Sequence, residues 1–211
     1  MHAFKFLSGF QVVLVALTIA LQAAAVVPQV WHDFVLYAKY SAPAYGLICP
    51  QPLGKTLVRK IDNLRTGANA YIVRDDQRCE VVIAFRGTSL ITDALTGVRF
   101  ILVLLKSTGI VNGGLVHAGF PDNYNSVAGQ ILRTVKTTKL SRRQCLKGRT
   151  VMVTGHSLGG AVAAVASYRT TNPKLADKLY TYGKVLIVVG NLVFARFVEA
   201  RVGKNNIFRG A

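Results

Sequence analysis

Thr150-Val151-Met152-Val153-Thr154-Gly155-His156-Ser157-Leu158-Gly159-Gly160 is the stretch that decides the fold. Its first five residues form a short β-rich run, and the small residues from Ala161 to Tyr168 predict a helix directly after it. The Gly-x-Ser-x-Gly run at 155–159 therefore falls where a strand turns into a helix, and its two glycines leave room for a sharp bend. We expect Ser157 to be presented at the mouth of that helix.

A serine in this position predicts nucleophilic catalysis. Its hydroxyl needs a base to take its proton and donors to hold the charge that develops on a substrate oxygen. The helix N-terminus favours an oxyanion, and the backbone amide of Leu158 is the first expected donor. His156 is adjacent in sequence and would point away from the hydroxyl, so we expect it to support the bend by packing. The alternative is a chance pentapeptide on an ordinary strand-to-helix turn.

Strands and helices alternate around this stretch, which favours a mostly parallel sheet with helices on its faces. A helix is predicted after Pro28, and another near Asp122 that buries Tyr124, Val127, Ile131 and Val135. A hairpin is predicted from 70–73 and 79–85, and a further strand at 179–182. The run at 185–189 follows it, and then a helix with Asn191 as its N-cap.

The composition fits one domain with a sizeable core, because 51% of the 211 residues are apolar. The formal charge is +17, from 26 Lys and Arg against 9 Asp and Glu, which favours anionic partners. No nucleic-acid motif is present, and no cofactor or metal site is indicated. We interpret the densest basic stretch as a solvated face, with attraction to lipid as the alternative; it comprises Arg133, Lys136, Lys139, Arg142, Arg143, Lys147 and Arg149.

The N-terminus reads as a secretory signal peptide over residues 1–25. An apolar run follows the lone Lys5 and ends in Ala23-Ala24-Ala25, which matches an A-x-A cleavage site. The domain would then cover 26–211 of a secreted, extracellular protein; a membrane anchor is the alternative. Of Cys49, Cys79 and Cys145, at most one pair can bridge, and the spacing does not say which.

Three runs resemble consecutive landmarks of the fungal class 3 lipases, namely 82–89 (VIAFRGTS), 116–120 (VHAGF) and 153–160 (VTGHSLGG). The resemblance implies an α/β-hydrolase fold, with a central mostly parallel sheet and helices on both faces. It implies that Ser157 is the nucleophile and that Thr88 is the second oxyanion donor beside Leu158. It also implies a mobile lid within Ser89–Val98, and the alternative for this segment is an ordinary surface helix. The implied substrates are carboxylic esters, and triacylglycerols are the substrates expected before all others. Feruloyl esterases share this fold, so a feruloyl ester is the alternative substrate.

The sequence also departs from the family pattern. In α/β-hydrolases an acidic residue and then a histidine follow the serine, yet no histidine follows Ser157, and Asp177 and Glu199 fall in segments that read as helix or helix flank. His117 reads as structural rather than as a recruited base. We expect a C-terminal segment of the fold to be lacking after 206–209; an inactive, lipase-like protein that binds lipid interfaces is the alternative. At 183–191 the family's Pro and Arg are missing and two residues are added.

Overall fold

The computed structural model describes residues 28–46, 49–87, 101–105, 113–140, 145–168, 175–183 and 189–210. Contacts divide the chain into a unit that ends at Val35 and a main unit from Leu36 onward. In the first unit, helix α2 (Pro28–Ser41) begins, and Trp31 stacks on Phe34 with ring centroids 6.2 Å apart. The predicted signal peptide at 1–25 lies outside the described residues. None of the described helices has the length and apolarity that a bilayer-spanning helix requires.

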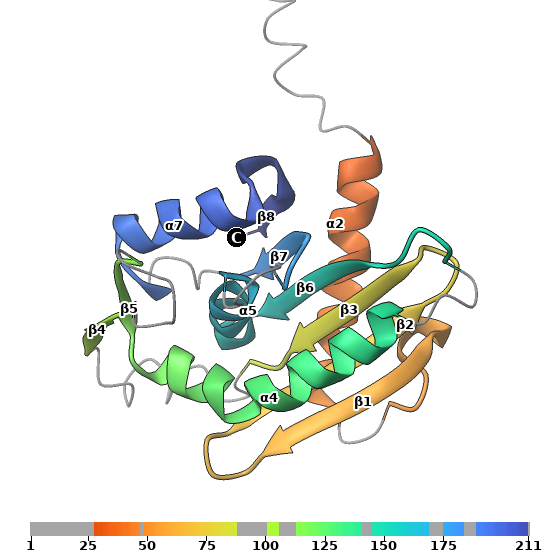
Figure 1. The fold of residues 1–211 in the computed structure, drawn as a ribbon, viewed down its shortest axis with the longest axis horizontal. Helices are drawn as coiled ribbons and strands as arrows, with labels where there is room; N and C mark the ends of the chain where they lie inside the picture. The colour runs from red at the N-terminus through yellow and green to blue at the C-terminus, as the bar shows by residue number, and fades with distance from the viewer. Residues whose placement is uncertain are drawn as a thin grey trace, which may run out of the picture. The chain divides into compact units, whose positions relative to one another are not determined.

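The main unit is built on a six-stranded sheet in the order β1-β2-β3-β6-β7-β8 (Figure 1). β1, β2 and β3 are antiparallel neighbours, whereas β3, β6, β7 and β8 run parallel to one another. The strands are β1 (Thr56–Asn63), β2 (Ala68–Asp75), β3 (Glu80–Phe85), β6 (Thr150–His156), β7 (Lys178–Tyr182) and β8 (Ile207–Gly210). The predicted hairpin is confirmed as β2 and β3, and the mostly parallel sheet is confirmed from β3 onward.

One face of the sheet carries the main core. The helices packed there are α4 (Gly119–Leu140), α5 (Leu158–Tyr168) and α7 (Leu192–Val202), with α4 and α5 against the strands and α7 against α5. Val151 and Val153 of β6 point into this core, because alternate residues of a strand face opposite sides. The four α4 residues predicted to be buried, Tyr124, Val127, Ile131 and Val135, are all buried in it.

The end of α2, from Leu36 to Ser41, covers the other face. The rings of Tyr37 and Tyr180 lie 4.2 Å apart, and the Thr154 hydroxyl donates to the Tyr37 carbonyl over 3.0 Å. The Ser41 and Thr154 hydroxyls are also hydrogen-bonded, at 3.0 Å. Helices therefore lie on both faces, as the resemblance implied.

A smaller sheet lies beside the first. It pairs β4 (Leu102–Leu104) with β5 (Leu115–His117), and Val116 of β5 bridges to Gly190 just before α7. Asn191 is the N-cap of α7, as predicted: its side chain accepts from the Phe194 amide at 3.0 Å and also from the Leu115 amide at 3.1 Å. Asn191 thus ties β5 to α7. Of the run at 185–189, residues 185–188 lie outside the described residues.

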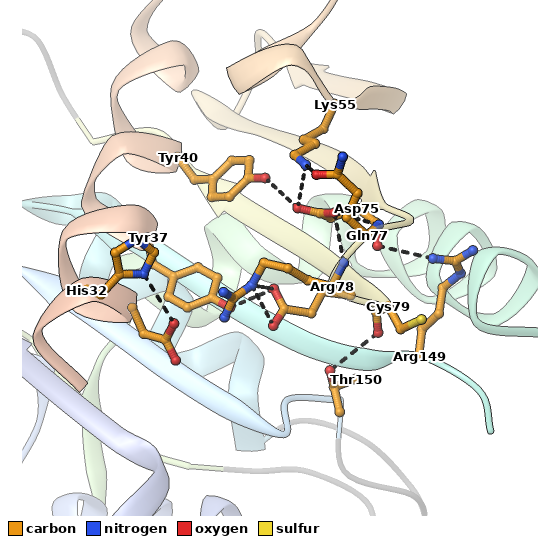
Figure 2. A network of polar contacts seen from close by, with 12 residues as sticks. His32, Tyr37, Tyr40, Lys55, Asp75, Gln77, Arg78, Cys79, Arg149 and Thr150 are labelled. Atoms are coloured by element: carbon orange, nitrogen blue, oxygen red, sulfur yellow. Dashed lines mark hydrogen bonds and ion pairs between the residues drawn. The ribbon is translucent and has the colours of Figure 1, made fainter. Parts of the chain in front are cut away.

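A disulfide and a polar network hold the amino end of the parallel strands, and Figure 2 shows the polar network. Cys79 and Cys145, which precede β3 and β6, are bonded with their Cα atoms 5.6 Å apart, and Cys49 is free. The Tyr37 hydroxyl donates to Glu80 over 2.6 Å, and the Arg78 guanidinium pairs with the same carboxylate at 3.1 Å. This network lies at the opposite edge of the sheet from the Ser157 bend.

The prediction of a solvated basic face is wrong for Arg149. Its side chain is buried, donates to the Asp75 carbonyl at 3.3 Å and pairs with the Asp76 carboxylate at 2.5 Å. A guanidinium whose donors reach a carboxylate and a carbonyl can be buried at tolerable cost. Arg133, Lys136 and Lys147 are exposed, as expected, and Arg142 and Arg143 lie outside the described residues.

Candidate active site

Ser157 lies at the junction of β6 and α5, where the sequence placed it. Its φ is 55°, a left-handed backbone conformation that few residues other than glycine adopt. Two hydrogen bonds fix the bend: the Ser157 amide donates to the Tyr182 carbonyl at 2.9 Å, and the Ser157 carbonyl accepts from the Gly160 amide at 2.8 Å. The Ser157 side chain is buried, with 9% of its surface exposed, so it is less open than its expected position at the mouth of the helix implied.

The two glycines of the motif are required by close backbone contacts. A Cβ on Gly159 would lie 2.8 Å from the Arg86 carbonyl carbon and 2.9 Å from the Gly87 nitrogen. A Cβ on Gly155 would overlap the Gly159 carbonyl group. Only residues without a side chain allow β3 and the start of α5 to approach this closely. The expected role of these glycines is therefore confirmed.

The end of β3 is brought directly to Ser157. A Cβ at Gly87 would lie 3.3 Å from the Ser157 Cβ and 2.5 Å from the His156 carbonyl oxygen, so the Phe-Arg-Gly run ends against the bend. Thr88, the predicted second oxyanion donor, follows Gly87 but lies outside the described residues, as does the predicted lid at Ser89–Val98. Leu158 is the first residue of α5, where backbone amides have no partner within the helix.

A tyrosine that the sequence did not single out also belongs to this site. The Tyr45 hydroxyl lies 2.9 Å from His156 Nδ1 and 3.4 Å from the His156 carbonyl oxygen. The same hydroxyl lies so close to Gly87 that a Cβ at this position would overlap it. Burial raises the pKa of Tyr45, while a hydrogen bond with the Gly87 backbone and the charge of Arg86 act to lower it. No motif marks Tyr45, because 111 residues separate it from His156.

The other titratable groups considered as catalytic partners are engaged elsewhere. His117 is buried on β5 with its ring packed edge-on against Phe120 at 5.7 Å, and burial lowers its pKa. Asp177, which was expected in a helix or helix flank, lies in a bend that directly precedes β7. Its carboxylate accepts from the Val151 amide at 2.8 Å at the amino edge of the sheet. Glu199 lies on α7 and pairs with Arg209 at 3.5 Å.

Within the described ranges, no residue forms a hydrogen bond with Ser157 Oγ. In the same part of the chain, no three His, Cys, Asp or Glu side chains gather as ligands of a metal ion would.

Comparison with known proteins decides the family. The model of Lipase (class 3) matches residues 82–210, which span β3 to β8 and include the bend. The chain belongs to the class 3 lipase family. Among curated relatives, the secreted mono- and diacylglycerol lipase 1 of Fusarium solani is 35% identical over 147 residues, which are 70% of this chain and 41% of that protein.

Solved structures agree with the α/β-hydrolase fold. The lipase of Rhizopus microsporus var. chinensis superposes with a TM-score of 0.68 at 29% identity, covering 84% of this chain and 64% of that one. A triacylglycerol lipase whose catalytic centre is a serine-protease triad superposes with a TM-score of 0.69 at 27% identity, covering 88% and 72%. This class 3 lipase chain spans less than half the length of the curated relatives it matches.

Proposed function

We propose that Ser157 is the nucleophile of a carboxylic ester hydrolase, and that its substrates are acylglycerols, with triacylglycerols first. The observation that carries the proposal is the left-handed bend of Ser157 at the start of α5, packed against the end of β3. Strained backbone of this kind persists where the surrounding structure holds it, and it clusters at active sites. Membership in the class 3 lipases supports the same reaction.

In the proposed reaction, Ser157 Oγ attacks the ester carbonyl carbon and its proton passes to a base. The carbonyl oxygen becomes an oxyanion, held by the amide of Leu158 and, as the family resemblance suggests, by Thr88. Collapse of this intermediate breaks the bond to the alcohol, which leaves with the proton, and an acyl-serine remains. Water then gives a proton to the base and attacks the carbonyl carbon of the acyl-serine. The bond to Ser157 Oγ breaks, Oγ regains a proton, and the fatty acid is released.

Strand β8 ends at the same edge of the sheet as Ser157. This strand runs parallel to β6 and β7, and the Gly183 amide donates to the Gly210 carbonyl at 2.8 Å, so β8 ends at the edge of the sheet where Ser157 lies. His156 is not assigned as the base, since its Nδ1 is paired with Tyr45.

The proposed location is extracellular, after cleavage of residues 1–25. The apolar run behind Lys5 supports it, and so does the disulfide between Cys79 and Cys145, because such bonds persist in oxidising compartments. Contact with a lipid–water interface would be transient. N-terminal sequencing of the secreted chain tests this point, and a first residue of Met1 would contradict it.

The decisive experiment is covalent labelling of Ser157. The chain is incubated with an alkyl fluorophosphonate, which phosphonylates activated serines, and the labelled peptide is located by mass spectrometry. We expect label on Ser157 and none after Ser157→Ala, with Ser126→Ala as a matched control for an ordinary helical serine. The hydrolysis rates of tributyrin, a dibutyrin and p-nitrophenyl butyrate are then measured, to compare a triacylglycerol, a diacylglycerol and an aryl ester as substrates.

Two results would replace the proposal. Label at Ser157 with turnover of aryl butyrate but not of acylglycerols would favour a feruloyl-type esterase. Absence of both label and turnover, together with binding to lipid vesicles, would favour the inactive, lipid-binding protein. A residual rate from the oxyanion donors alone is distinguished by its survival in Ser157→Ala.

A further inference from the structure

A buried hydroxyl lies on β6 just before the Ser157 bend, on the sheet face that the end of α2 covers. Thr154 is the third residue before Ser157, and its side chain is fully buried. The strand residues before it, 151–153, are apolar. A buried hydroxyl costs free energy unless it finds a hydrogen-bond partner, and valine would fill the same space without one. Packing alone therefore does not account for a threonine here.

The Thr154 hydroxyl is bonded to two groups at the end of α2. It donates its proton to the Tyr37 carbonyl oxygen over 3.0 Å. Because it has only that proton to give, it accepts in its 3.0 Å contact with Ser41, whose hydroxyl donates. Ser41 Oγ also lies 3.3 Å from the Tyr37 carbonyl oxygen, so the three groups form a closed α2–β6 triangle. Ser41 is buried as well, so water has little access to these bonds.

The chain that follows α2 contacts β6 a second time, nearer the bend. The Tyr45 hydroxyl lies 2.9 Å from His156 Nδ1, and the two rings meet edge to face at 6.0 Å. Residues 154 and 156 point to the same face of the sheet, because alternate residues of a strand do so. The segment 37–45 therefore holds the last two positions of β6 on this face, and Ser157 follows directly.

We propose that Thr154 is a positioning residue, whose hydroxyl fixes the end of β6 against α2 and thereby holds the Ser157 bend in place. The left-handed backbone at Ser157 persists only where the surrounding structure holds it. Two backbone bonds close the bend itself, from the Ser157 amide to the Tyr182 carbonyl and from the Gly160 amide to the Ser157 carbonyl. The α2–β6 triangle anchors the strand from which these bonds are made. The catalytic consequence rests on the proposed function, whereas the hold on the bend does not.

The test uses three variants of the whole chain. Thr154→Val removes the hydroxyl and keeps the branched shape, and Thr154→Ser keeps the hydroxyl and removes a methyl group. Thr138→Val is the matched control, because Thr138 is also buried and donates to a helix carbonyl, that of Thr134 at 2.7 Å. Thr138 lies near the end of α4, whose Lys139 pairs with Asp177 at the amino edge of the sheet.

Two readouts are compared among these variants. Deuterium exchange of the Ser157 and Gly160 amides, followed by NMR, reports on the bend without any need for activity. Hydrolysis of p-nitrophenyl butyrate, with kcat and KM measured separately, reports on the position of the Ser157 hydroxyl.

We expect the Ser157 and Gly160 amides to exchange about five- to tenfold faster in Thr154→Val, since the loss of one hydrogen bond corresponds to about that factor. The amides of α4 should be unaffected by this change, whereas Thr138→Val should speed exchange in α4 and leave the bend unaffected. Thr154→Ser should restore exchange at the bend to within about twofold of the wild type. In Thr154→Val the kcat should fall about three- to tenfold with KM changed less than about twofold, because binding of the substrate is not disturbed.

Three results would overturn the proposal. Exchange at the bend that is the same in Thr154→Val and the wild type, or equally fast in Thr154→Val and Thr154→Ser, would show that the hydroxyl does not hold the bend. Faster exchange with an unchanged kcat would overturn the positioning role.

The proposed function can fail separately from this inference. If the wild type shows no Ser157-dependent turnover, the proposed function fails, and exchange still decides whether the α2–β6 triangle holds the bend. If Thr154→Val does not fold, Ser41→Ala removes one corner of the triangle from the helix side, and its exchange at the bend is judged by the same criteria.

Discussion

Replacing Ser157 by glycine and by alanine should measure the strain at the bend. At a φ of 55°, any residue with a Cβ carries a penalty of about 1–2 kcal/mol, which glycine avoids. Glycine loses more backbone entropy on folding than alanine, by about 0.5–1 kcal/mol. The difference predicts that Ser157→Gly is more stable to unfolding than Ser157→Ala by about 0.5–1 kcal/mol, although neither variant can form an acyl-serine.

The assay is urea unfolding followed by fluorescence and circular dichroism, with the same pair of substitutions at Ser126 as control. Ser126 lies inside α4, and its φ is not among the positive values. There the glycine variant should be less stable than the alanine variant by about 1 kcal/mol. The order of the two variants should thus reverse between the sites. If glycine were no better than alanine at 157, the bend would hold no strain, and the geometric argument for a nucleophile there would fail.

Three further predictions concern stability. Removing the disulfide by Cys79→Ser with Cys145→Ser frees a loop of 66 residues and should lower the unfolding free energy by about 4 kcal/mol, measured in urea without reductant; an unchanged midpoint would contradict the bond. Asn191→Ala loses its bonds to two amides and should cost about 1–2 kcal/mol in thermal unfolding, and a cost below that of a surface Asn→Ala would refute the capping role. Burial lowers the pKa of His117 below its ordinary 6.5, so the unfolded chain takes up a proton at a higher pH than the folded chain does. The free energy of unfolding should therefore fall as the pH drops below about 6.5. In His117→Gln the free energy of unfolding should depend less steeply on pH, and the same dependence in both proteins would contradict the prediction.

The sequence predicted those features that depend on local pattern. The bend at Ser157, the buried face of α4 and the cap at Asn191 each follow from residues within one or two turns of one another. β1 was not predicted, because it is an edge strand in which Ile61 alone is fully buried, so its residues show no clear alternation. Strand signals are weak where neither face meets a core along most of the strand.

Features that depend on strand register could not be predicted. The pairing of Cys79 with Cys145 follows from the parallel register of β3 with β6, which sets Glu80 beside Thr150. Burial of Arg149 depends on Asp76, 73 residues away, and Tyr45 contacts a histidine 111 residues away. Long-range contacts of this kind leave no periodic trace in a single sequence.

The direction of β8 has a practical consequence for work on this chain. Because the strand delivers Gly210 to the same side of the sheet as Ser157, a purification tag or fluorescent fusion appended there would emerge beside the Ser157 hydroxyl and obstruct access to it. Exposed Lys147, close to the disulfide on the far side, is a better anchor for surface immobilisation, since attachment there leaves the Ser157 side facing the solution.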